Sequence, residues 1–334
     1  MRYYSLLLSL LLFSCKDALD TVVTADPYTE IKKALSIDPA ALENYAAQGK
    51  PAYVNKDNTA ANPITDKTAS LGRVLFYDKN LSTNNTIACA SCHKQEFAFG
   101  DTATTSLGVE NGRTIRHSMR LINTRYAVEA KFFWNERAAS LEAQTTMPIV
   151  DHLEMGFSGQ TGRGTITSLI TKLNGIGYYK ELFKLAYGDA TITEARMQTA
   201  LAQFVRSIQT FDSKYDVGRA QVGNDAAPFP NFTAQENAGK NLYLAPPIFN
   251  AASERIGGGF GCQGCHQAPE FDIDPNSGNN GIIGNLAGGI DITVTRAPSL
   301  RDLVKQDGTL NGNLMHTAAI TSLQAAIGHY GTIN

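Results

Sequence analysis

The sequence has few cysteines, a single tryptophan, no excess of charge of either sign and, outside its first residues, no long apolar run. Its formal net charge is −2, so nothing in the composition indicates the strongly basic surface that nucleic acid binding requires. No segment after the N-terminus is long and apolar enough to cross a bilayer. Runs typical of β-strands are scarce and short. The 334 residues therefore predict a mainly α protein with room for one large or two ordinary domains.

Four of the five cysteines lie in two copies of one motif, Cys-x-x-Cys-His, written "CASCH" and "CQGCH". This spacing is the attachment signature of c-type haem, in which two thiols form thioether bonds and the histidine ligates the iron. A zinc site would need two more soft ligands per motif, and a thioredoxin-like pair would need a parallel sheet that the sequence does not indicate. A disulfide within the motif would not need the histidine. The sequence predicts two covalently attached haems, at Cys89, Cys92 and His93 and at Cys262, Cys265 and His266.

The N-terminal segment, residues 1–15, has the features of a secretory signal peptide. Arg2 precedes an apolar run from Leu6 to Phe13, which is too short to span a bilayer. The final "LFSC" is similar to a lipobox, with cleavage before Cys15 and a lipid on its thiol. An ordinary signal peptide cut slightly later is the alternative. Both predict a periplasmic protein, whose only membrane contact would be a lipid anchor at Cys15.

Composition divides the rest of the chain. Residues 16–62 are polar and mixed, and predict an N-terminal arm with short helices at "YTEIKKAL" and "PAALENYAAQ". Two helical domains are predicted to follow, at 63–215 and 216–334, each with one Cys-x-x-Cys-His motif. Gly, Pro and Asn in residues 213–231 predict a linker, and the Gly- and Asn-rich residues 275–291 predict an irregular loop.

Capping pairs and apolar periodicity predict three helices. The strongest covers "TITEARMQTALAQFVRSIQTF", with Thr191 and Glu194 as a capping box. Five apolar residues fall on one of its faces: Met197, Leu201, Phe204, Val205 and Ile208. The same pairing in "TAQE" and "TSLQ", which begin at Thr233 and Thr321, predicts two further helix starts.

Met315, in "NGNLMHTAA", is the candidate sixth ligand of the second iron. It lies 49 residues after His266, in a predicted loop that could cover this haem. Methionine opposite histidine raises the reduction potential, which suits a haem that carries electrons. A methionine that only packs against the haem edge is the alternative.

Three blocks of the sequence resemble the bacterial di-haem cytochrome c peroxidases and their MauG-type relatives. The blocks are "LGRVLFYDKNLSTNNTIACASCHKQEFAFGD", "FFWNERAASLEAQTTMPIVDHLEMGF" and "TRAPSLRDL" followed by "LMHTAA". The resemblance covers residues 63 to 330 and implies two cytochrome c-like helical domains, each with one covalently attached haem. It assigns peroxide chemistry to the haem of His93 and electron entry to the haem of His266 and Met315.

The resemblance also implies roles for residues of the central block. Trp134 would relay electrons between the haems, Gln144 would orient peroxide, and Glu154 would take a proton from peroxide and return it to the leaving oxygen. A buried core aromatic is the alternative for Trp134. The implied reaction is the reduction of hydrogen peroxide to water, with electrons from a small cytochrome c or a copper protein. Family members are often homodimers.

Several positions depart from the family's pattern. Many members have a histidine that caps the first iron, and Val109 occupies that position here. We therefore expect this haem to be open and high-spin, or to be capped by another residue such as His117. His117 itself replaces the asparagine of an "RNSP"-like motif, and Arg296 stands where a smaller residue is common. The inter-haem calcium site is thus expected to be altered or lost. "WNER", which starts at Trp134, replaces "WDGR".

Two other functions stay open. A MauG-like enzyme would oxidise a residue of a partner protein, but that type has tyrosine in place of the methionine ligand. A plain di-haem electron carrier would need neither Glu154 nor Gln144.

Overall fold

The computed structural model describes residues 26–128, 131–273 and 275–332, so the predicted signal peptide and Cys15 lie outside the described residues. Its helices are α1 (Thr29–Leu35), α2 (Asp66–Tyr77), α3 (Cys89–Cys92), α4 (Leu141–Val150), α5 (Ile166–Asn174), α6 (Gly177–Tyr187), α7 (Glu194–Ser207), α8 (Lys214–Arg219), α9 (Ala234–Leu244), α10 (Cys262–Cys265) and α11 (Leu323–Thr332). Single turns of 3-10 helix are η1 (Lys79–Leu81), η2 (Gln95–Phe97) and η3 (Val109–Asn111). The strands are β1 (Pro247–Phe249), β2 (Arg255–Gly258), β3 (His266–Gln267) and β4 (Asp272–Ile273). The prediction of a mainly α fold is confirmed.

The strands form two small antiparallel pairs, β1 with β2 and β3 with β4. Among the described residues, no helix is both long enough and apolar enough to cross a membrane.

Helices α2 and α7 cross at the centre of the first lobe, with α4 and α6 packed against them. The predicted apolar face of α7 is buried, from Met197 at 0% exposure to Ile208 at 7%. Gly72 allows the close crossing, because a β-carbon at this position would lie 2.0 Å from the carbonyl oxygen of Ala200. This core holds the haem-motif helix α3, which follows α2 along the chain.

Two of the three predicted helix caps are wrong by one or two residues. Helix α7 is capped by Thr193, whose side chain accepts from the Arg196 amide, and Thr191 lies outside the helix. In α11 the Ser322 hydroxyl, rather than Thr321, accepts a hydrogen bond from the amide of Ala325. The predicted capping box of α9, which begins at Thr233, is confirmed.

The N-terminal arm contains α1 as predicted, but the second predicted helix, "PAALENYAAQ", does not form. The amides of Tyr45 and Ala46 instead donate to the carboxylate of Asp66, both at 2.8 Å. The segment predicted as a linker is also partly helical, since it contains α8. Asp216 in α8 is buried against the Arg301 guanidinium, which fixes this segment to the second lobe.

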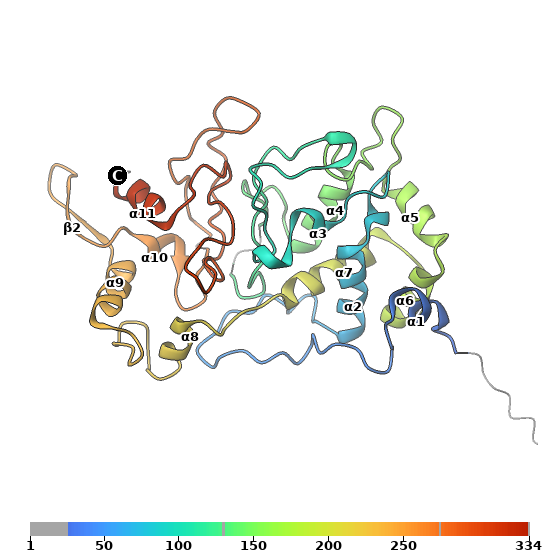
Figure 1. Cartoon of the computed structure of the whole chain (residues 1–334), viewed down its shortest axis with the longest axis horizontal. Coiled ribbons are helices and arrows are strands. Elements are labelled where there is room, and N and C mark those ends of the chain that lie inside the picture. Colours follow the sequence, from blue (N-terminus) through green and yellow to red (C-terminus); the bar gives the residue numbers. More distant parts are fainter. Residues whose placement is uncertain (1–25, 129–130, 274, 333–334) are drawn as a thin grey trace, which may run out of the picture.

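Figure 1 shows helices α1 to α7 gathered on one side of the molecule and α9 to α11 on the other, with the blue N-terminal arm running along one edge from α1 to α8. The two sides are hydrogen-bonded, because the His117 amide donates to the carbonyl of His316 at 2.8 Å. The amides of Thr295 and Arg296 both donate to the carbonyl of Trp134, at 3.1 Å. The predicted domain boundaries at residues 62 and 215 stay predictions.

Candidate functional site

The first Cys-x-x-Cys-His motif forms one wall of a large cavity. Helix α3 presents Cys89 and Cys92 to this cavity, and His93 follows directly as the residue that ends the helix. The His93 Nδ1 atom lies 3.0 Å from the carbonyl oxygen of Phe99. This contact fixes the ring with Nδ1–H as the donor and leaves Nε2 available, which is the usual arrangement of a metal-ligating histidine.

None of the four described cysteines forms a disulfide. Burial raises the pKa of Cys89 to about 12 and that of Cys92 to about 11. These thiols are therefore protonated and poorly nucleophilic, unlike a thioredoxin-type pair. Among the described residues, no group of three or more His, Cys, Asp or Glu side chains could hold a metal ion. The motif beside an apolar cavity fits a haem.

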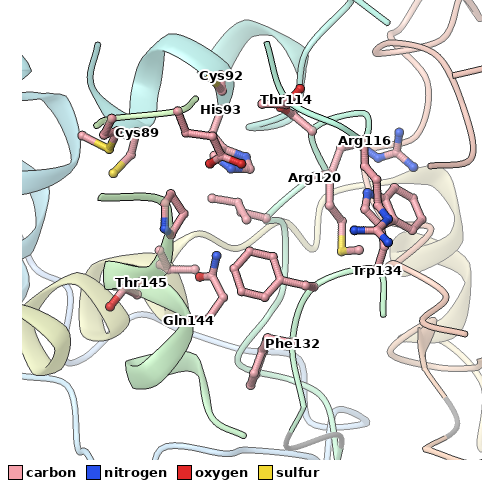
Figure 2. A pocket seen from close by; sticks show the side chains of 18 of the residues that line it. Cys89, Cys92, His93, Thr114, Arg116, Arg120, Phe132, Trp134, Gln144 and Thr145 are labelled. Atoms are coloured by element: carbon pink, nitrogen blue, oxygen red, sulfur yellow. The ribbon is translucent and has the colours of Figure 1, made fainter. Parts of the chain in front are cut away.

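Gln144 and Glu154 both line this cavity. Figure 2 shows His93 and Gln144 on opposite sides of the cavity, with Gln144 projecting from helix α4. Helix α4 ends at Val150, and a short loop then carries Glu154 back to the cavity. Asp151 holds this loop by accepting from the amides of Leu153 and Glu154, at 2.8 and 3.1 Å.

The loop of Glu154 packs tightly against the segment that follows the motif. The Val109 amide donates to the carbonyl of Glu154 at 2.9 Å. A β-carbon on Gly108 would lie 1.8 Å from the carbonyl oxygen of Leu153, and one on Gly112 would lie 2.4 Å from it. Both glycines are required for this approach, which sets the position of Glu154.

The Glu154 carboxyl has the electrostatics of a general acid or base. Burial raises its pKa to about 7, and the charge of Asp151 adds to the effect while Arg137 opposes it. Within the described parts of the chain, the carboxylate makes no hydrogen bond or ion pair. Its charge also raises the pKa of both Cys89 and Cys92, so it lies near the haem motif. A free carboxyl that titrates near neutral pH can exchange a proton with a ligand in the cavity.

Trp134 lines the same cavity and also touches the second lobe. Its side chain is 8% exposed, and Nε1 donates to the carbonyl of His117 at 2.7 Å. Its ring centroid lies 6.1 Å from that of His316. Trp134 is therefore a buried aromatic at the junction of the lobes, a position that suits an electron relay and also stabilises the contact.

The second motif is built in the same way but lies outside this cavity. Helix α10 carries Cys262 and Cys265, and His266 begins strand β3. Burial lowers the pKa of His266 to about 4, so the imidazole is neutral and able to ligate a metal. The Tyr243 hydroxyl donates to the backbone carbonyl of His266 and helps to fix it.

Met315 is linked to the second motif through Asn280. The Asn280 side chain donates to the Met315 sulfur at 3.0 Å. Asn280 also forms a hydrogen bond with Tyr330. The pKa of Tyr330 is raised mainly by burial and also by Cys265 and Cys262, so Tyr330 lies near the second motif. The Met315 sulfur and the thiols of the second motif therefore lie in one region of the second lobe. Ligation of iron by Met315 stays a prediction.

The structure shows where the residues that depart from the family pattern lie. Val109 is 1% exposed, and its side chain faces Gly156 in the core. His117 lines the first cavity, but its Nδ1 is held 2.8 Å from the carbonyl oxygen of Ala103. Arg296 donates to the Met119 sulfur at 2.7 Å. That the calcium site is altered or lost stays a prediction.

Some residues of the site were not found from the sequence. Asn280 and Tyr330 beside Met315, and Tyr243 beside His266, are polar residues without any local motif. Arg120 lines the first cavity from the segment between the two motifs. No sequence motif marks these residues, because each of them contacts residues that are distant in the chain.

Comparison with known proteins identifies relatives. Residues 66–222 match the family model described as di-haem cytochrome c peroxidase. The methylamine utilization protein MauG of Methylorubrum extorquens is 30% identical over 281 residues, which cover 81% of this chain and 70% of that protein. The cytochrome c551 peroxidase of Nitrosomonas europaea is 26% identical, with 91% of this chain and 86% of that protein covered. A crystal structure of a MauG-like protein associated with microbial copper homeostasis has the same fold, with a TM-score of 0.62, 24% identity, and coverage of 84% and 80%.

Proposed function

Because the chain belongs to the family of di-haem cytochrome c peroxidases and MauG proteins, we propose that it is a peroxidase that reduces hydrogen peroxide to water with electrons from a small redox protein. The observation that carries this proposal is a single cavity lined both by His93 and by the Glu154 carboxyl, which has no partner among the described residues. An electron carrier would not need such a cavity.

Two haems are proposed as covalent cofactors in two helical domains, at residues 63–215 and 216–334. Cys89, Cys92 and His93 would hold the first haem, and Cys262, Cys265 and His266 the second, with Met315 as its further ligand. The bound irons would supply the electrons and the electrophilic site that peroxide reduction requires.

The chain itself supplies proton transfer and orientation. Glu154, when ionised, accepts a proton from hydrogen peroxide and then donates it to the oxygen that leaves. Gln144, which lines the same cavity, can hydrogen-bond peroxide or water with its amide. Two protons from solvent and two electrons then complete the formation of two waters. Trp134 provides an aromatic contact between the lobes for electrons that enter at the second haem.

The donor is proposed to be a small cytochrome c or a copper protein that binds through a small, transient interface. The proposed location is the periplasm, after cleavage of residues 1–15, with an optional lipid on Cys15. A homodimer is proposed from family resemblance alone.

A MauG-like oxidation of a partner protein is the second candidate, and a MauG protein among the relatives favours it. Met315 favours the peroxidase, because the MauG type has tyrosine as the ligand. The two functions share Glu154 and both haems. Turnover of free peroxide with a soluble donor distinguishes them.

The test is peroxide turnover with a reduced small cytochrome c, by wild type and by Glu154→Gln. We expect kcat/KM for peroxide to fall by about 10²-fold or more, because the amide cannot accept the proton. Glu110→Gln is the matched control, since Glu110 is 64% exposed, pairs with Arg163 and lies outside the cavity. Equal and negligible turnover in all three proteins would favour the electron carrier instead.

The pH dependence gives a second readout of Glu154. Its pKa of about 7 lies above the ordinary value, so the carboxyl is protonated and unable to accept a proton in mild acid. We expect kcat/KM for peroxide to rise as pH increases through about 7. This limb should be absent from the residual activity of Glu154→Gln, and its persistence there would assign it to another group.

A further inference from the structure

Arg120 is a positive charge in the wall between the two haem motifs. Its side chain lines the His93 cavity on the side of Arg116 and Trp134 (Figure 2). Its stem packs on the turn that follows His93, since a β-carbon on Gly100 would lie 3.0 Å from Arg120 Cγ. This side of the cavity faces the other lobe, because Arg116 pairs there with Asp291.

The neighbouring arginines of this wall have partners, whereas Arg120 has none in the described part of the protein. Arg116 pairs with the Asp291 carboxylate, and Arg296 donates to the Met119 sulfur. The Arg120 guanidinium makes no hydrogen bond or ion pair to a described residue, and its Nε atom is shielded from solvent. The charge of Asp302 acts on Arg120 without forming an ion pair with it. Burial lowers the pKa of Arg120 to about 10, as expected for a poorly solvated cation.

Arg120 is half-buried in the cavity wall, and a guanidinium there with a shielded Nε and no protein partner is unfavourable, so the loaded protein should provide an anion at this point. The planar fork of N–H donors in arginine matches a carboxylate. Haem carries propionate carboxylates, and no cysteine or histidine of the two motifs satisfies them. We propose that Arg120 binds a haem propionate at the wall between the two sites and raises the reduction potential of that haem. This inference rests on the proposed function, because it requires both haems to be present.

The sign and size of the effect follow from electrostatics. A nearby positive charge favours the reduced iron, which carries one positive charge less. Unit charges about 10 Å apart in an effective dielectric of about 20 change an equilibrium constant roughly tenfold. For a one-electron couple this corresponds to about 59 mV.

The experiment is a spectroelectrochemical titration of both haems in the holoprotein, at several pH values and with and without chloride. Arg120→Gln removes the charge, and Arg120→Lys keeps the charge but loses the fork. Arg113→Gln is the matched control, because Arg113 is exposed, lies in the same segment and does not line the cavity. Intact mass and haem content are measured for every variant.

We expect Arg120→Gln to lower the midpoint potential of one haem by about 59 mV, which is a tenfold change in the equilibrium constant. The haem whose potential shifts is the one whose propionate Arg120 binds. Arg120→Lys should keep most of the wild-type midpoint potential, because the charge is retained. The pH range in which this potential changes as the propionate is protonated should move to higher pH, because lysine stabilises the ionised propionate less. Arg113→Gln should match wild type.

Two outcomes would overturn the inference. The first is a pair of unchanged potentials in an Arg120→Gln protein that carries both haems. The second is a wild-type potential that varies with chloride, which would make the ligand a free anion. If Arg120→Gln does not load haem, an Arg120→Lys protein with wild-type pH dependence also contradicts it. Wild type without covalent haem would instead contradict the proposed function.

Discussion

Val109 and Glu154 show how single residues determine what the first cavity can do. Val109 has no atom that can ligate iron, and its buried side chain packs in the core. Its amide nevertheless holds the carbonyl of Glu154 at 2.9 Å. The residue therefore offers no ligand to the first iron and at the same time positions the carboxyl for which we propose proton exchange.

From this we predict that the oxidised protein, as isolated and with both haems loaded, contains one high-spin haem. The only histidine of the described cavity wall besides His93 is His117, and its Nδ1 is already held by the carbonyl of Ala103. Electron paramagnetic resonance and absorption spectra of the ferric protein measure this directly. Two low-spin signals would contradict the prediction, and restoration of a high-spin signal by His117→Ala would then identify His117 as the cap.

At the scale of elements, helix starts were harder to predict than helix faces. The apolar face of α7 follows from periodicity alone, because a helix with five such residues has to bury them. The caps depend on which hydroxyl reaches a free amide, and "TITEAR" offers two threonines. The spacing of Thr191 and Glu194 fits a capping box and led to the prediction of Thr191 as the cap. In the structure, Thr193 caps the helix. The helix predicted near Tyr45 does not form for a related reason. The Tyr45 amide donates its hydrogen bond to the Asp66 carboxylate, which lies 21 residues away in the chain.

The cap assignment predicts unequal effects of two threonine substitutions. Thr193→Ala leaves the Arg196 amide without its acceptor and should lower the free energy of unfolding by about 1 kcal/mol. Thr191→Ala removes only an exposed contact with Asp189 and should have a clearly smaller effect. Urea unfolding of the first lobe, followed by circular dichroism, measures both. A larger loss in Thr191→Ala would restore the cap expected from the sequence.

For the whole molecule, the two haem motifs could be predicted from sequence because each is complete within five residues. Gln144 and Glu154 could not be predicted without the resemblance, since their proximity to His93 depends on how α4 and the following loop fold back. The contacts between lobes were also hidden, because they use backbone groups such as the carbonyl of Trp134 that any sequence possesses. The N-terminal arm is the largest of these hidden features. It runs past both lobes (Figure 1), with Asn58 bonded to Arg206 and Tyr53 bonded to Asp216.

Lys56 in this arm pairs with two buried carboxylates beside the second haem motif. Its ammonium group lies 2.6 Å from Asp272 and 3.7 Å from Glu270, whose side chains are 4% and 2% exposed. It also donates to the side chain of Gln267, the residue after His266, at 3.3 Å. The arm thus holds β3 and β4 together from outside the second lobe.

We predict that Lys56→Met lowers the free energy of unfolding of the second lobe by about 3 kcal/mol at pH 7, because it leaves buried carboxylates without a counter-charge. Burial already raises the pKa of Asp272, and Lys56 opposes this effect. Loss of Lys56 should raise the pKa further, so that Asp272 is protonated as the pH falls and needs no partner. The deficit should therefore shrink between pH 7 and pH 5, as measured by urea unfolding of the holoprotein at each pH. Lys32→Met is the control, since the pair of Lys32 with Asp26 in the same arm is largely exposed and should contribute nothing measurable. A deficit that is equal at both pH values would show that Lys56 acts through packing of its stem rather than through its charge.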